Sequence, residues 1–302
     1  MKPLTIESIP VNRTLHPFPK AVIFEIVAGC NLRCVMCPQK EMTRPKGVMD
    51  LRLYQRLIDE VAATDPETEV WAPIMGEVFV HKGLVFDYLT YAKQAGLKKI
   101  FLNSNFVLFK EEFMDRLEAC GLDKLTIGLD AATEETYDRV RVGGDFARVE
   151  RNIQSLLDAK ARGRLKNLEV ILQFIVQEEN QHDEELFKQK WAGRGLTLKV
   201  RQKLGWGLGV PADNLSLPDT DRTIPCPWLM RTMSIHWTGR VAQCDAVWNG
   251  EQYVGDLTRQ TIQQVWNDEL LNMRRKHLVN DFAWDPCRDC KDWQCGLSEV
   301  YQ

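Results

Sequence analysis

The stretch AVIFEIVAGCNLRCVMCPQ, residues 21–39, joins an apolar run to a group of three cysteines. Its first seven residues are mostly β-branched or aromatic, which predicts a buried strand over 21–27. Cys30, Cys34 and Cys37 follow at once, separated by three and two residues. Functional groups of parallel α/β sheets lie at the carboxyl ends of the strands, so this position predicts a functional loop.

The pattern of that first strand recurs downstream. Further apolar runs predict strands, and apolar spacings of three and four residues between them predict amphipathic helices. Strands alternating with helices indicate parallel β/α units. A full eight-unit barrel needs about 250 residues, so the length favours an α/β fold with a partial (β/α)6 TIM-like barrel. The predicted strands are 21–27, 70–75, 99–105, 124–130, 169–176 and 196–202, and the predicted helices are 51–63, 84–95, 111–119, 146–160 and 184–192.

The pattern changes beyond residue 205. Two short strand-like runs around Thr238-Gly239 predict a β-hairpin, and one amphipathic helix is predicted over 261–278. So small a segment buries little core, and we expect a metal or cluster to stabilise it. The predicted organisation is an N-terminal extension (1–20), a barrel (21–205), a connector rich in Gly, Pro and Asp (206–225) and a small hairpin-plus-helix domain (226–302).

The composition is that of an ordinary globular protein. With 39 basic and 42 acidic residues the net charge is −3, which gives no electrostatic reason to expect nucleic acid or an anionic membrane as a partner. No apolar run approaches the ~20 residues of a membrane helix. The N-terminus lacks the pattern of a secretory signal, so we expect a cytoplasmic protein.

The nine cysteines fall into two groups and one isolated residue. Clustered cysteines in a cytosolic chain point to metal binding or catalysis rather than to disulfides. Cys120 stands alone at the end of a helix-like run, and we expect it to be a buried apolar residue. The first group is Cys30, Cys34 and Cys37, and the second is Cys226, Cys244, Cys287, Cys290 and Cys295.

Three thiolates suit a metal site that stays open. A four-iron cluster takes one ligand per iron, so three cysteines leave one iron without a protein ligand. An open coordination position is what separates catalytic from structural zinc sites. The spacing alone also allows a zinc site that a His or Asp from elsewhere completes.

This cysteine spacing, placed after the first strand of a partial barrel, resembles that of the radical S-adenosyl-L-methionine (SAM) enzymes. The resemblance implies a [4Fe-4S] cluster on Cys30, Cys34 and Cys37, with SAM at the open iron. It further implies that SAM is cleaved to a 5′-deoxyadenosyl radical, which abstracts hydrogen from the substrate. A flavodoxin- or ferredoxin-like partner would supply the electron.

The resemblance extends to residues expected to contact SAM. Gly76 and Glu77 match the family's Gly-Gly-Glu run, in which Glu77 would accept the SAM ammonium. The NSN run resembles the family's Thr-Asn-Gly-like run, and Arg141 would meet the SAM carboxylate. Met36 stands where the family usually has an aromatic residue. The SAM contacts implied in this way are Met36, Gly76, Glu77, Asn103, Ser104, Asn105 and Arg141.

The second cysteine group resembles the SPASM/Twitch auxiliary domain of the same superfamily. The chain ends soon after the last cysteine, which favours the Twitch form with one cluster. A second [4Fe-4S] cluster would then bind Cys226, Cys244, Cys287 and Cys290; the alternative is structural zinc on the same residues. Cys295 is not needed for this cluster. Its alternative roles are those of an inert thiol, a cluster ligand or a hydrogen-atom donor to a substrate radical.

The length of the chain and the arrangement of its cysteines resemble those of dehydrogenases and epimerases of aminoglycoside pathways. This implies a small polar substrate, a carbohydrate or aminocyclitol, which Cys295 as donor would epimerise. There are three alternatives. The first is dehydrogenation with the auxiliary cluster as electron acceptor, the second is peptide modification, and the third is a non-enzymatic zinc or iron–sulfur protein. Only 29 residues precede Cys30, which argues against a leader-peptide-binding domain. Trp206, Trp248, Lys203 and Asp245 lie in segments suited to line a substrate pocket.

Overall fold

The structure is a computed structural model that describes residues 13–72, 75–207, 209–211, 222–294 and 298–301. Parallel strands form the centre of a curved sheet, and each pairs in register with the next in chain order. This confirms the predicted partial barrel. The strands are β1 (Ala21–Phe24), β4 (Glu69–Ala72), β5 (Ile100–Ser104), β6 (Lys124–Gly128), β7 (Glu169–Val176) and β8 (Thr197–Gln202).

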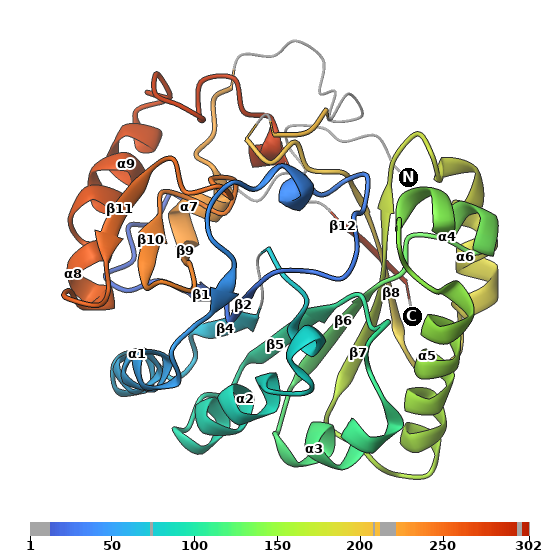
Figure 1. Cartoon of the computed structure of the whole chain (residues 1–302). Helices are drawn as coiled ribbons and strands as arrows, with labels where there is room; N and C mark the ends of the chain where they lie inside the picture. Colours follow the sequence, from blue (N-terminus) through green and yellow to red (C-terminus); the bar gives the residue numbers. More distant parts are fainter. Residues whose placement is uncertain (1–12, 73–74, 208, 212–221, 295–297, 302) are drawn as a thin grey trace.

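Helices cover the outer face of this sheet (Figure 1). The first of them, α1 (Leu51–Thr64), begins where the Asp50 carboxylate accepts a hydrogen bond from the Leu53 amide, and it buries Tyr54, Leu57, Ile58 and Val61 against the sheet. The others are α2 (Val85–Gln94), α3 (Met114–Ala119), α4 (Glu134–Val140), α5 (Phe146–Ala161) and α6 (Glu184–Trp191). Short 3₁₀ turns are η2 (Pro38–Glu41), η3 (Val78–His81), η4 (Glu111–Phe113), η5 (Gln181–Asp183) and η6 (Asp292–Gln294).

The C-terminal segment extends the same sheet instead of forming a separate layer. Strand β9 (Thr232–Ile235) pairs parallel with β1, and β12 (Ser298–Tyr301) pairs antiparallel with β8 at the opposite edge. The predicted hairpin is confirmed, because β9 and β10 (Arg240–Ala242) pair antiparallel and Gly239 takes a φ of 84° in the turn. The resulting sheet has ten strands, with β11 (Tyr253–Asp256) as one edge.

The single helix predicted over 261–278 is wrong. The structure has two, α8 (Ile262–Trp266) and α9 (Glu269–Leu278), after the short α7 (Pro227–Arg231). The break falls at Asn267, whose side-chain amide donates to the Pro17 carbonyl, and at Asp268, which lies outside the helical region at φ −107° and ψ −110°. A tertiary contact with the N-terminal segment therefore overrides the continuous apolar spacing. No helix in the part of the chain that the structure describes is long and apolar enough to cross a bilayer.

Candidate functional site

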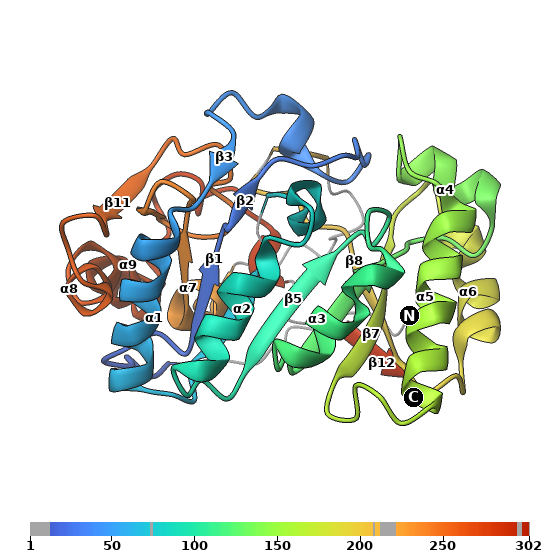
Figure 2. The same ribbon diagram turned by 60° about the horizontal axis from the view of Figure 1, so that its bottom comes forward.

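The cysteine loop begins at the carboxyl end of β1. A two-residue strand, β2 (Val27–Ala28), pairs with β3 (Gly47–Val48), and these strands flank the loop (Figure 2). Gly29 forms a bridge with Gly76, which follows β4. A Cβ on Gly76 would lie 1.9 Å from the Val27 carbonyl oxygen, so only glycine allows this approach. The loop is thereby held against the segment that carries Glu77.

The three thiols lie in a desolvated setting. Burial, aided by the Glu77 carboxylate and the neighbouring thiols, raises the pKa of Cys30 to about 12. Burial also raises the pKa of Cys37 to about 11 and that of Cys34. Without a cation the thiols are neutral, and a bound iron centre would stabilise their thiolates. The described His, Cys, Asp and Glu side chains form no group of three or more arranged around a single metal ion.

Glu77 is a buried carboxylate beside this loop, with 1% of its surface exposed. Its Oε1 accepts from the Phe79 amide at 3.1 Å and from the Ser104 hydroxyl at 2.8 Å, and its Oε2 accepts from the Asn105 amide at 2.6 Å. Desolvation nevertheless raises the pKa of Glu77. A fixed buried carboxylate that no described cation contacts directly is suited to receive a ligand ammonium group.

The NSN run reaches the same loop from the end of β5. The Asn105 side-chain amide lies 3.6 Å from the Cys30 sulfur and donates to Asn31 Oδ1 at 3.0 Å. Ser104 holds Glu77, whereas Asn103 is partly exposed on the opposite face of β5. Ser104 and Asn105 therefore lie with Glu77 and Cys30, while Asn103 lies on the other face of β5.

Arg141 lies beside Cys34 but already has a partner. Its Nη1 donates to the Cys34 sulfur at 3.5 Å, and its Nη2 forms an ion pair with the fully buried Asp130. The sequence reasoning did not single out Asp130, although a polar residue directly after a parallel strand is a usable signal. The Nε of Arg141 is buried without a partner among the described groups. One N–H group of the guanidinium thus remains available to an incoming anion.

Met36 connects the loop to the C-terminal segment. Its side chain is buried, and its carbonyl accepts a hydrogen bond from Trp206 Nε1 at 3.1 Å. Asp292 fixes the Trp206 turn by accepting from the amides of Gly205 at 2.6 Å and Gly207 at 2.8 Å. The amide of Asp292 in turn donates to the Cys290 sulfur at 3.4 Å. Cys290 is thus joined to the first cysteine loop through two side chains.

The second cysteine group lies in loops next to α7, the β9–β10 hairpin and η6. Cys226 precedes α7, Cys244 follows β10, and Cys287 and Cys290 precede η6. Burial raises the pKa of Cys244 well above its usual range, and the neighbouring Asp245 carboxylate and the Cys226, Cys287 and Cys290 thiols raise it further. The side chain of Gln243, next to Cys244, donates to the Cys287 sulfur at 3.8 Å, so the loops that carry these two cysteines are adjacent.

Buried N–H donors lie beside these thiols. Arg222 Nη2, His277 Nε2 and Trp284 Nε1 meet no acceptor at full hydrogen-bond geometry among the described atoms. The side chain of Arg222 lies against the Cys226 thiol, and that of Trp284 lies against the Cys287 thiol. Arg222 Nη1 donates to the Cys287 carbonyl at 3.3 Å, and the Cys226 amide donates to His277 Nδ1 at 3.1 Å, which leaves the His277 proton on Nε2. Burial and the Arg222 charge lower the pKa of His277 to about 3. Such donors fit an anionic group among the cysteines, as an iron–sulfur cluster would be.

The other residues singled out in the sequence are Cys120, Asp245, Trp248 and Cys295. Cys120 is fully buried, and its thiol donates to the Leu117 carbonyl at 3.2 Å, which confirms its structural role. Asp245 is hydrogen-bonded to the Ser234 hydroxyl, and the Trp248 carbonyl accepts from Arg44 at 2.7 Å. Cys295 lies outside the described residues.

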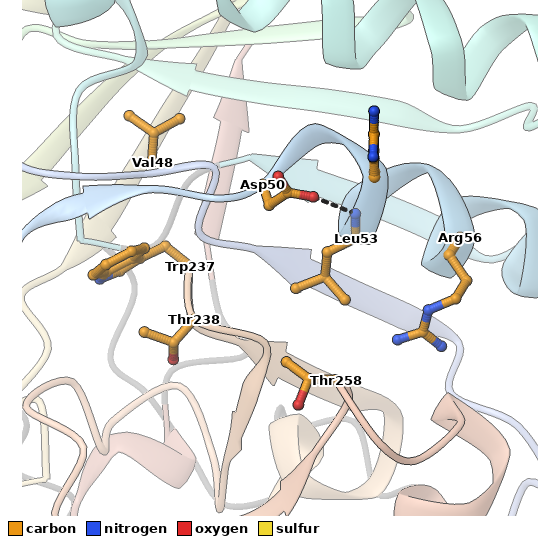
Figure 3. A pocket seen from close by; sticks show the side chains of 8 residues that line it. Val48, Asp50, Leu53, Arg56, Trp237, Thr238 and Thr258 are labelled. Carbon is orange, nitrogen blue, oxygen red and sulfur yellow. Dashed lines mark hydrogen bonds between the residues drawn. The ribbon is translucent and has the colours of Figure 1, made fainter.

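A surface pocket lies apart from this site. Figure 3 shows Leu53 and Arg56 of α1 on one side and Trp237, Thr238 and Thr258 on the other. None of the cysteines and none of the predicted SAM contacts lines it. The pocket is part of the contact between α1 and the β9–β10 turn.

Known proteins share both halves of this arrangement. Residues 24–188 match the Radical SAM superfamily, and residues 226–291 match the SPASM iron–sulfur cluster-binding domain. An AdoMet-dependent heme synthase of Methanosarcina barkeri is 32% identical over 147 residues, which are 47% of this chain but only 40% of that protein.

Two solved structures share the fold. BtrN in complex with AdoMet and 2-DOIA has a TM-score of 0.61 at 15% identity, over 90% of this chain and 92% of that one. Streptococcus suis SuiB bound to precursor peptide SuiA has a TM-score of 0.69 at 13% identity, over 94% of this chain and 77% of that one.

Proposed function

Because the chain belongs to the radical SAM superfamily and carries a SPASM segment, we propose that it epimerises a small polar substrate, a carbohydrate or aminocyclitol, at a carbinol carbon. The observation that carries the proposal is the loop of three cysteines, with Cys34 buried and Cys30 and Cys37 partly buried, beside Glu77 and Arg141. The superfamily works with SAM and a [4Fe-4S] cluster, and SPASM domains bind additional clusters.

The proposed roles of the residues follow from their contacts. When bound, the cluster and SAM supply a 5′-deoxyadenosyl radical that abstracts a hydrogen atom from the substrate. Cys30, Cys34 and Cys37 would hold that cluster, and Glu77 would accept the SAM ammonium group. Arg141, kept in place by Asp130, would offer its remaining N–H to the SAM carboxylate. Met36, Gly76, Ser104 and Asn105 would shape the same pocket, whereas Asn103 lies on the other face of β5.

The auxiliary site would hold one further [4Fe-4S] cluster on Cys226, Cys244, Cys287 and Cys290. The buried N–H donors of Arg222, His277 and Trp284 support an anionic group at this place. In the proposed epimerisation, Cys295 returns a hydrogen atom to the opposite face of the substrate carbon. The resulting thiyl radical would need an electron and a proton, and a cluster held at the auxiliary site would supply the electron. A flavodoxin- or ferredoxin-like protein is the proposed external donor.

Two assays test this proposal. Dithionite-reduced wild type should form 5′-deoxyadenosine from SAM and Cys30→Ala should form none; equal cleavage by both proteins would reject the assignment. Turnover in deuterated water separates the reactions. Deuterium at a stable carbon of the product supports a thiol donor, which Cys295→Ala should abolish, whereas a ketone product supports dehydrogenation.

A further inference from the structure

The turn at Trp206 contains two successive residues in the left-handed region. Trp206 has a φ of 50° and Gly207 has a φ of 59°. Glycine adopts this region freely, whereas the Cβ of a tryptophan crowds the backbone there. Such a conformation persists only where neighbouring groups hold it, and it is common at functional sites. The contacts of Trp206 therefore bear on the function of this turn.

Asp292 holds the turn from the side of the second cysteine group. Its side chain is buried, and its two carboxylate oxygens accept from the amides of Gly205 and Gly207, on either side of Trp206, at 2.6 Å and 2.8 Å. The Asp292 amide donates to the Cys290 sulfur at 3.4 Å. A cluster at the auxiliary site would convert this thiol to a thiolate, which is a stronger acceptor. The turn is thus linked to the state of Cys290.

Gly207 brings the same turn against two further segments of the C-terminal region. A Cβ at this residue would lie 3.2 Å from the carbonyl oxygen of Ala246, which is two residues after Cys244. The same Cβ would lie 3.3 Å from the Cβ of Pro286, which directly precedes Cys287. The turn therefore packs against the segments that carry both cysteines.

Trp206 fixes the first cysteine loop from the other side. Its Nε1 donates to the Met36 carbonyl at 3.1 Å, and the Cys37 amide, in the same peptide group, donates to the Cys34 carbonyl at 3.1 Å. A peptide group is planar, so a hydrogen bond at each end fixes its orientation. The Met36 carbonyl oxygen has a second lone pair, so this contact does not block a donor on a ligand. The Met36 side chain has three rotatable bonds, and the bond to its backbone supplies rigidity that the side chain lacks.

We propose that Trp206 is a positioning residue for SAM and that Asp292 couples it to the auxiliary site. The proposal rests on the proposed function, in which Met36 lines the SAM pocket. Trp206 holds the Met36 peptide group in the orientation that receives SAM, and Asp292 holds Trp206 when Cys290 is a cluster ligand. Coupling between two sites is reciprocal, so a filled auxiliary site and bound SAM stabilise each other.

Anaerobic calorimetric titration of the reconstituted holoenzyme with SAM, without a reductant, tests the positioning role. Trp206→Phe keeps an aromatic ring but loses the N–H group, so it should bind SAM about fivefold more weakly than wild type. Trp237→Phe is the matched control. Trp237 Nε1 donates to the Pro45 carbonyl at 3.0 Å, on the segment that follows the first cysteine loop, and loss of this bond should leave SAM binding unchanged.

Two further variants test the coupling. Asp292→Asn leaves one glycine amide without an acceptor and should weaken SAM binding by a similar factor. Combined with Trp206→Phe it should add nothing, because both changes break the same chain of contacts. The Cys226→Ala/Cys244→Ala protein, which retains Cys290 but should not hold the auxiliary cluster, should bind SAM as Asp292→Asn does.

The proposal is overturned if Trp206→Phe binds SAM as tightly as wild type, if Trp237→Phe weakens binding equally, or if the effects of Trp206→Phe and Asp292→Asn are additive. If Asp292→Asn does not fold, the comparison of the two tryptophan variants decides. Cleavage of SAM by dithionite-reduced wild type is measured on the same preparation. If wild type binds and cleaves SAM and the variants bind it equally well, only the positioning role is wrong. If wild type does neither, the proposed function itself fails.

Discussion

At the scale of single residues, the site depends on close approaches that few side chains permit. The cysteine motif and the Gly76-Glu77 pair could be predicted from the sequence, because their spacing is local and follows strands. Arg222 could not, because its importance arises from a tertiary contact with the second cysteine group. The position of Asp130 after a strand was a usable signal, but its pairing with Arg141 was not predictable. Burial of both partners, which the linear sequence does not encode, decides these contacts.

Gly76 gives the first prediction. In Gly76→Ala the new methyl would overlap the Val27 carbonyl, so we expect a loss of about 1–3 kcal/mol in unfolding free energy and weaker SAM binding. Gly29→Ala is the matched control, since a Cβ there meets nothing closer than Lys46 at 3.9 Å. Chemical denaturation and SAM titration measure both effects, and equal behaviour of the two variants would contradict the steric argument.

Arg222 gives a second prediction, which concerns the midpoint potential of the auxiliary cluster. A partly buried guanidinium beside the auxiliary cysteines favours the more negative, reduced cluster. Arg222→Gln should therefore shift the midpoint potential of the auxiliary cluster to a more negative value, as followed by redox titration with electron paramagnetic resonance. Arg275→Gln on the exposed side of α9 removes the same charge and should leave the potential unchanged. An identical potential in all three proteins would show that Arg222 does not contact the cluster.

At the scale of elements, Arg44 clamps the two cysteine-bearing segments together. Its guanidinium pairs with the buried Glu25 beyond β1, and its Nε donates to the Trp248 carbonyl, four residues after Cys244. The Asn249 side chain also accepts from the amides of Thr43 and Arg44, at 2.8 Å and 3.2 Å. The segment after the first cysteine loop is thus fixed to the loop that follows Cys244.

Removing the ion pair between Arg44 and Glu25 should lower the free energy of unfolding. Arg44→Met leaves the Glu25 carboxylate buried without its cation, so we expect a loss of about 3–5 kcal/mol in unfolding free energy. Arg52→Met, at an exposed position of α1, should change the unfolding free energy by no more than about 0.5 kcal/mol. Urea denaturation of the apo-proteins compares the two, and similar midpoints would rule out a structural role for the pair.

The elements themselves were only partly predictable. Alternating periodicity located the six parallel strands because each is buried on its helical side. The break between α8 and α9 was missed because it depends on the contact of Asn267 with Pro17, which lies 250 residues away in sequence. The α4 helix was missed because it spans only Glu134–Val140, too short for a clear apolar period.

At the scale of the whole molecule, one sheet unites the two family segments. Because β9 pairs with β1 and β12 pairs with β8, the C-terminal residues complete both sides of the parallel core. Sequence patterns cannot show this, since strand pairing across some 200 residues leaves no local trace. We expect the apo-protein to unfold in one calorimetric transition. Two separated transitions would mean that the barrel and the C-terminal segment are independent domains.

The central claim is an iron at Cys30, Cys34 and Cys37 that no side chain covers. The most direct test is electron paramagnetic resonance of a Cys226→Ala/Cys244→Ala variant, reconstituted anaerobically and reduced, so that the signal comes from the first site alone. We predict a [4Fe-4S] spectrum that changes when SAM is added. A spectrum indifferent to SAM, or a protein that contains zinc in place of iron, would contradict the account.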